Sequence, residues 1–147
     1  MKAWPVLPIA IVQTFLCLAH WFLYRTWIDF WWPLSPAASF ALRIALAALS
    51  ILFVVAAILS FQFSNPAVRF FYWIASVWLG ISNFFFVGAC FAWLADLGLR
   101  LILPGSDHLA ARPYIAGTLV VASLVAALYG IFNARNIRQR RPHGAPA

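Results

Sequence analysis

Four long stretches of this chain contain no Asp, Glu, Lys or Arg, and they run over residues 4–24, 44–63, 70–95 and 113–133. Each stretch is close to the roughly 20 apolar residues that an α-helix needs to cross a ~30 Å hydrocarbon core. A helix in lipid satisfies its own backbone hydrogen bonds, whereas an irregular segment does not. The pattern therefore predicts an all-α membrane protein, with four transmembrane helices in an antiparallel bundle.

The composition indicates that nearly the whole chain is one membrane domain. Hydrophobic residues make up 65% of the 147 residues and charged residues 9%, whereas soluble domains have roughly 45–50% and 25%. We predict a transmembrane domain over residues 1–135, with spans at about 4–24, 38–63, 67–97 and 113–133. Residues 136–147 are predicted to form a basic, disordered cytoplasmic tail, because a short polar terminus has too little apolar surface to fold.

The basic residues are distributed unequally between the two ends of the predicted bundle. The end that holds both termini has six, and the opposite end has four. The positive-inside rule then predicts an N-in/C-in orientation. Because these residues flank apolar spans, the net charge of +7 predicts contact with the lipid bilayer and its anionic phospholipid head groups, and no nucleic-acid partner. The six are Lys2, Arg69, Arg135, Arg138, Arg140 and Arg141, and the four are Arg25, Arg43, Arg100 and Arg112.

The first predicted span ends at about Tyr24 and is followed by a tryptophan-rich segment, residues 25–33. Tryptophan rings are enriched at the level of the lipid head groups. We therefore predict that Trp27, Trp31 and Trp32 are membrane-interface residues.

The third predicted span is longer than a bilayer is thick. It could continue to Leu103, so we expect it to tilt, to protrude or to break near Gly98. Its last turns contain Asp96 and Arg100, an i,i+4 pair in the order that favours an ion pair. A loop over residues 104–112 is expected to precede the fourth span.

Small residues recur at four-residue spacing on the third and fourth predicted spans. Such ladders let helix backbones approach closely in lipid, where the hydrophobic effect contributes little. They predict helix packing within the bundle or, alternatively, a seam between two copies of the chain. The positions are Ser76, Gly80, Gly88 and Ala92 on the third span, and Ala122, Ala126, Gly130 and Ala134 on the fourth.

Three polar residues, Asn83, Gln13 and Thr14, lie inside the predicted spans. At this depth a polar side chain is expected to form a hydrogen bond to another helix, and the same residues could line a path for a transported substrate. A proton-coupled transporter normally has an ionisable group in the membrane, and the centres of these spans contain no charged residue. Cys17 and Cys90 are also mid-span and are predicted to be buried free thiols that pack as small apolar side chains.

The sequence contains no motif typical of a catalytic or metal-binding site. It has three His, three Asp and no Glu, and only Asp107–His108 are adjacent. His20 could approach Asp29 or that dipeptide only if the loops fold back together. We therefore predict no catalytic residue, no metal and no cofactor. An enzyme that acts on lipid through these residues is the weakest alternative.

Two short stretches give the chain a resemblance to a known family. They are residues 71–80, with the sequence FYWIASVWLG, and residues 129–135, with the sequence YGIFNAR. With the spacing of the four spans, they resemble the N-terminal membrane region of bacterial membrane-anchored metallophosphoesterases of the calcineurin-like superfamily. The resemblance extends from the first span to about Arg138.

In that family, a soluble phosphoesterase domain follows the membrane region. It binds two metals through Asp-x-His, Gly-Asp, Gly-Asn-His-Asp/Glu and Gly-His-x-His motifs, and none of the four occurs in this chain. The resemblance therefore implies a multi-pass membrane anchor in a bacterial inner membrane, without its catalytic domain, and no catalytic residue is carried over.

These observations leave two main functions open. The first is a non-catalytic membrane anchor that binds lipid or positions a partner, which could be a separate phosphoesterase domain or a second copy of the chain. The second is a small transporter or channel subunit with a path lined by Asn83, Gln13 and Thr14.

Overall fold

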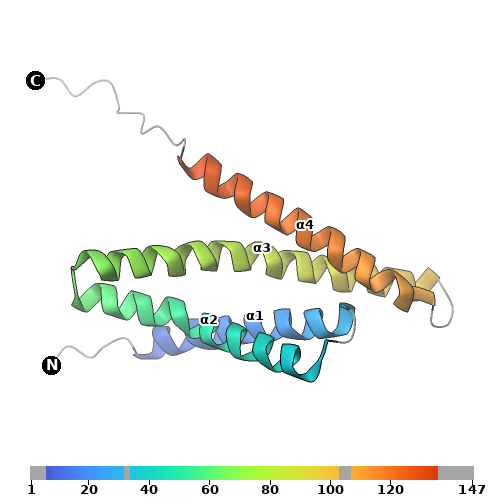
Figure 1. The fold of residues 1–147 in the computed structure, drawn as a ribbon, viewed down its shortest axis with the longest axis horizontal. Coiled ribbons are helices and arrows are strands. Elements are labelled where there is room, and N and C mark those ends of the chain that lie inside the picture. Colours follow the sequence, from blue (N-terminus) through green and yellow to red (C-terminus); the bar gives the residue numbers. More distant parts are fainter. Residues whose placement is uncertain (1–5, 32–33, 103–106, 136–147) are drawn as a thin grey trace, which may run out of the picture.

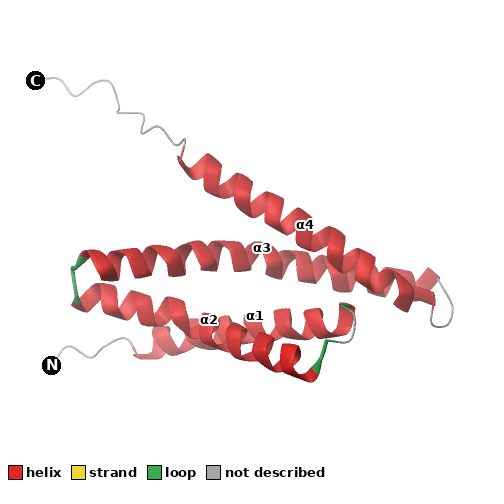
Figure 2. Cartoon of the chain, viewed as in Figure 1, coloured by secondary structure: helices red, strands yellow, loops and turns green. Residues whose placement is uncertain are grey.

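The computed structural model describes residues 6–31, 34–102 and 107–135, and these residues form four α-helices (Figure 1). The helices are α1 (Val6–Phe30), α2 (Pro36–Gln62), α3 (Pro66–Ile102) and α4 (Asp107–Arg135). Each is long and apolar enough to cross a membrane, and the described residues include no strand (Figure 2). The predicted fold class, an all-α protein with four helices of membrane-spanning length, is confirmed.

Helices α2 and α3 both begin with a polar cap followed by a proline. Ser35 Oγ accepts a hydrogen bond from the Ala38 N–H at 3.2 Å, and Asn65 Oδ1 accepts one from the Val68 N–H at 2.8 Å. Such caps satisfy N–H groups that have no partner in the first helical turn. A proline fits at this point because the N–H group that it lacks would have had no partner within the helix.

Successive helices run in alternate directions along the long axis of the molecule in Figure 1. Helix α3 contacts all three of the others, and α1 also contacts both α2 and α4. By contrast, no described Cα atom of α2 lies within 8 Å of a Cα atom of α4. The C-terminal end of α4 leads away from α3 in Figure 1. The N-in/C-in orientation stays a prediction.

Helix α1 extends beyond the span that the sequence predicts. It continues from Tyr24 to Phe30, so most of the segment predicted as an interfacial region is helical. Thr26 and Phe30 are only 8% and 1% exposed, and both contact Trp93 of α3. The contacts with α3 thus stabilise two further turns of helix.

Helices α3 and α4 also differ from the predicted bounds. Helix α3 passes through Gly98 without a break. Helix α4 begins at Asp107, so residues 109–112, predicted as part of a loop, are helical, and Pro113 lies inside the helix. This early start places Arg112 beside α3, where its contacts offset the hydrogen bond that a proline cannot donate.

One face of α3 is buried at intervals of seven residues. Ala75, Ser82, Ala89 and Asp96 lie on this face. A seven-residue interval keeps the same face of a helix toward its packed neighbours. Three of the four side chains are small, which lets the neighbouring helices approach closely.

Two of the small residues that the sequence singles out, Gly88 and Gly130, face a neighbouring helix. A Cβ atom at Gly88 would overlap Ser123 Oγ of α4, and one at Gly130 would lie 3.8 Å from the Phe84 ring of α3. The buried small residues of α4 include Ser123 and Ala127. The packed face of α4 is therefore displaced by one residue from the predicted positions Ala122 and Ala126. The other positions vary: Ala92 is buried, Ser76 and Ala126 are half-buried, and Gly80 and Ala122 are exposed.

Replacing Gly88 with leucine is expected to separate α3 from α4 and to destabilise the bundle by about 1–3 kcal/mol, the usual cost of overpacking. Ser123 could move aside only by giving up its hydrogen bond to the Phe84 carbonyl oxygen. Thermal unfolding of the purified protein in detergent measures the effect. Gly80→Leu is the matched control, because a Cβ atom at Gly80 meets nothing within 4 Å. Equal melting temperatures for the two variants would contradict the role assigned to Gly88.

Candidate functional site

A buried ion pair joins α3 to α4. Asp96 of α3 is only 1% exposed and accepts two hydrogen bonds from Arg112 of α4, from Nε to Oδ1 at 2.8 Å and from Nη2 to Oδ2 at 2.9 Å. Such a fork gives both carboxylate oxygens a charged donor and is among the strongest polar contacts in proteins. The pair lies at the end of the bundle where α3 ends and α4 begins (Figure 1).

Three further residues surround this pair. Arg100, one turn after Asp96, places Nη2 at 2.8 Å from Asp96 Oδ2. Arg112 directs Nη1 toward the Asp29 carbonyl oxygen of α1, at 3.5 Å. The Arg112 Cζ atom also lies 5.2 Å from the centre of the Phe30 ring, a favourable position for a cation. Helices α1, α3 and α4 therefore meet around one guanidinium group.

The sequence predicts the pairing of Asp96 with Arg100 but misses the partner on α4. A signal is nevertheless present, because Asp96 and Arg112 lie at similar distances in sequence from the connection between α3 and α4. A short connection makes two consecutive helices antiparallel neighbours, so positions equally far from it come to similar heights. An acidic and a basic residue matched in this way could have indicated the pair.

Two buried polar residues of α1 are hydrogen-bonded to tryptophans of α3. Trp78 Nε1 donates to His20 Nε2 at 3.3 Å, and His20 Nδ1 lies 2.9 Å from the Leu16 carbonyl oxygen. Since Nε2 accepts a hydrogen bond, the ring proton belongs on Nδ1, where it is donated to Leu16. Trp93 Nε1 donates to Thr26 Oγ1 at 3.0 Å. These contacts connect the two helices through groups that would otherwise be costly to bury.

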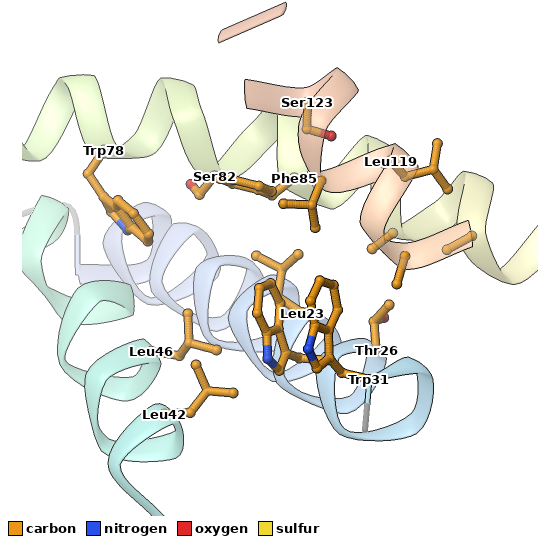
Figure 3. Close-up of a pocket in the computed structure, with 16 residues that line it drawn as sticks. Leu23, Thr26, Trp31, Leu42, Leu46, Trp78, Ser82, Phe85, Leu119 and Ser123 are labelled. Carbon is orange, nitrogen blue, oxygen red and sulfur yellow. The ribbon is translucent and has the colours of Figure 1, made fainter. Parts of the chain in front are cut away.

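An apolar cavity of about 190 Å³ lies among the four helices (Figure 3). Trp27 and Trp31 form part of its wall, with ring centres 5.0 Å apart and ring planes inclined by only 8°. Leu42 and Leu46 of α2 also line the cavity, and Figure 3 labels both of them together with Trp31. Other lining side chains come from the remaining helices and include Leu23, Phe85 and Leu119.

The hydroxyl groups in the cavity wall are already hydrogen-bonded to backbone carbonyl oxygens. Ser82 Oγ donates to Leu79 at 3.0 Å, and Ser123 Oγ donates to Phe84 at 3.2 Å. Thr26 Oγ1 donates within its own helix in the same way, at 2.9 Å. Burying a polar solute without partners is costly, so this cavity is suited to hydrocarbon.

The structure does not bring together the three polar residues of the predicted transport path. Gln13 Nε2 donates to the Ser50 carbonyl oxygen of α2 at 3.2 Å and lies 3.1 Å from Cys17 Sγ. Thr14 is exposed and donates within its own helix. Asn83 is exposed on α3. None of the three lines the apolar cavity, so the described residues give the transport path no support.

The remaining predicted residues have varied positions. Trp27 and Trp31 line the cavity, and their place at the membrane interface stays a prediction. Cys17 and Cys90 are free thiols, of which Cys17 is exposed and Cys90 half-buried, whereas the sequence predicts both as buried. Within the described residues, no group of three or more His, Cys, Asp or Glu side chains could hold a metal ion. Outside the described part of the chain lie Trp32, Arg138, Arg140 and Arg141, and also the side chains of Asp107, His108, Ala134 and Arg135.

Comparisons with known proteins found no relative. The chain matches no protein-family model, no curated protein and no solved structure. Its function is therefore inferred from its own residues and their geometry.

Replacing Asp96 with leucine is expected to destabilise the bundle by about 3–5 kcal/mol, because the guanidinium of Arg112 then loses its carboxylate. Adding Arg112→Met is expected to recover most of that loss, since an apolar pair has no charge to desolvate. Thermal unfolding of both single variants and of the double variant in detergent measures this. Additive losses in the double variant would show that the two side chains act independently and would contradict the pairing.

Proposed function

We propose that this chain is a multi-pass, non-catalytic membrane module that binds the hydrocarbon part of a membrane lipid. The observation that carries the proposal is the apolar cavity of about 190 Å³ among the four helices. In a bilayer, the medium around such a bundle is hydrocarbon, and an acyl chain can fill the cavity because the three hydroxyl groups in its wall are already hydrogen-bonded to backbone carbonyl oxygens.

The outer surface of the bundle supports a position within a bilayer. Large apolar side chains are exposed on every helix, for example Phe15 at 64%, Phe61 at 83%, Leu94 at 62% and Val125 at 61%. Soluble monomers rarely expose apolar patches of more than a few hundred Å². Contact with lipid removes the free-energy cost of exposing these side chains to water, because lipid tails are as apolar as the side chains themselves.

The two helices on either side of the cavity, α2 and α4, are not packed against each other. Leu42 and Leu46 of α2 and Leu119 and Val120 of α4 line the cavity, yet no described Cα atoms of these helices come within 8 Å. A lipid chain would enter sideways between α2 and α4, without leaving the hydrocarbon core.

Filling the cavity with protein is expected to displace the lipid. Ala89 is 6% exposed and lines the cavity, so Ala89→Leu would occupy part of it. The lipid retained per protein is expected to fall by roughly tenfold, because the leucine side chain occupies space that the acyl chain would fill and removes its van der Waals contacts with the cavity wall. Native mass spectrometry of the protein released from detergent measures the retained lipid.

The matched control for this experiment is Ala95→Leu, the same substitution at an exposed position of α3. Melting temperatures of both variants check that the bundle stays folded. Equal lipid retention by Ala89→Leu and Ala95→Leu would rule out the cavity as the binding site.

The resemblance to metallophosphoesterases adds a role as an anchor. In that family, the membrane region precedes a catalytic domain, and we propose that this module positions a separate phosphoesterase domain at a bacterial inner membrane. An N-in/C-in orientation would place that partner in the cytoplasm. The basic tail after the fourth span would favour the anionic cytoplasmic leaflet by about 1 kcal/mol per arginine near the surface.

A C-terminal reporter enzyme that is active only outside the cytoplasm is expected to remain silent, because the positive-inside rule retains the basic end in the cytoplasm. A neighbouring reading frame is expected to encode the family's metal-binding motifs. Reporter activity would reverse the proposed orientation. Neighbouring frames without those motifs would remove the anchor role and leave the lipid-binding proposal to its own test.

A further inference from the structure

A second hollow, of about 440 Å³, lies between α1 and α3. Its apolar part is lined by Phe22 of α1 and by Cys90, Leu94 and Leu97 of α3, and Arg100 is the lining residue nearest to the end of α3. No residue lines both this hollow and the four-helix cavity. We call it the Arg100 groove and treat it as a separate site.

The Arg100 groove combines accessible apolar side chains with an accessible cation. Leu94 and Leu97 are 62% and 55% exposed, and the Arg100 side chain is 45% exposed. Asp96 also lines the groove, but its side chain is only 1% exposed, so its carboxylate is covered by the arginines that it binds. A ligand in the groove therefore meets a guanidinium group as its main polar partner.

The charges around Asp96 do not balance. Arg112 binds both carboxylate oxygens, and Arg100 reaches one of them, at 2.8 Å. One carboxylate thus faces two guanidinium groups. With the adjacent Arg25–Asp29 pair, joined at 3.2 Å, the cluster has three arginines and two aspartates and carries one positive charge in excess. The more exposed of the two arginines is Arg100, at 45% against 16% for Arg112. A phosphate group complements such a site, because its oxygens accept several hydrogen bonds from a guanidinium group.

The length of the Arg100 groove matches one leaflet of a bilayer. From Cys90 to Arg100 the helix rises by about 15 Å, at 1.5 Å per residue. The hydrocarbon of one leaflet is also about 15 Å thick, half of a ~30 Å core. A lipid lying along α3 would therefore place its acyl chain on Leu94 and Leu97 and its phosphate at Arg100.

We propose that the Arg100 groove binds an anionic phospholipid, with the phosphate on Arg100 and one acyl chain along the apolar side chains of α3. A zwitterionic lipid offers the same phosphate but adds a cation beside the excess positive charge, so an anionic head group is preferred. The Arg100 groove is independent of the four-helix cavity. Ala89→Leu is therefore expected to leave the preference of the groove for an anionic phospholipid unchanged.

The test uses the full chain in nanodiscs of phosphatidylcholine that contain increasing fractions of phosphatidylglycerol. Native mass spectrometry reports which lipid stays bound. Arg100→Gln is expected to lower the preference for phosphatidylglycerol roughly fivefold, the equivalent of about 1 kcal/mol for one arginine near an anionic surface. Arg100→Lys keeps the charge and is expected to keep most of the preference. Arg43→Gln is the matched control, because Arg43 lies on α2, against Phe40 and outside the groove.

A second readout identifies the position of the lipid. A phosphatidylglycerol with a photoreactive acyl chain is expected to label the peptides that contain Phe22 or residues 90–97. The proposal would be overturned if Arg100→Gln and Arg43→Gln lowered the preference for phosphatidylglycerol equally. Labelling confined to α2 and α4 would also overturn it. Displacement of the lipid by millimolar inorganic phosphate would also overturn it, because it would indicate a site for free phosphate.

Folding of the variants is checked by their melting temperatures in pure phosphatidylcholine. Arg112 still binds both oxygens of Asp96 in Arg100→Gln, so this variant is expected to remain folded. If it unfolds, the lipid preference of Arg100→Lys and the labelling pattern of the unaltered chain decide the outcome.

Discussion

The ion pair between Asp96 and Arg112 is the contact on which one end of the bundle depends. A charged group near hydrocarbon is costly unless it is paired and hydrogen-bonded. The fork that meets this requirement joins Asp96, near the end of an α3 helix that is unbroken through Gly98, to Arg112 in the second turn of α4. Phe30 of α1 then lies beneath the guanidinium group. One electrostatic requirement thus relates the lengths of two helices to the position of a third.

The number and class of the helices could be predicted because lipid leaves the backbone few alternatives. The ends of the helices could not be predicted in the same way. Charge-free runs indicate which residues lie in the hydrocarbon core, but they do not indicate the last hydrogen-bonded turn of a helix. Helix α1 continues past Tyr24 because Thr26 and Phe30 find partners on α3. Residues 109–112 are helical for a similar reason, because Arg112 binds Asp96 of α3. Both extensions depend on contacts between residues far apart in the sequence.

The candidate site was harder to predict, because residue type does not say which way a helix faces. Gln13 and Asn83 look equivalent in the sequence, yet Gln13 bonds to α2 and Asn83 is exposed. Gly88 and Gly80 differ in the same way, since α4 packs against the first and nothing approaches the second. The four-helix cavity has no sequence signal of its own, because its wall combines residues from every helix.

The charged contacts and the small-residue contacts divide α4 into two mechanically different halves. The first turns of α4 are held to α3 by the ion pair between Arg112 and Asp96. The C-terminal half diverges from α3 (Figure 1) and is held by packing contacts, such as that of Gly130 with the Phe84 ring. A pull on the C-terminal side would peel α4 away one turn at a time and would load the ion pair last. A pull on the connection between α3 and α4 would load it first. The force needed to extract the module therefore depends on the direction of pulling.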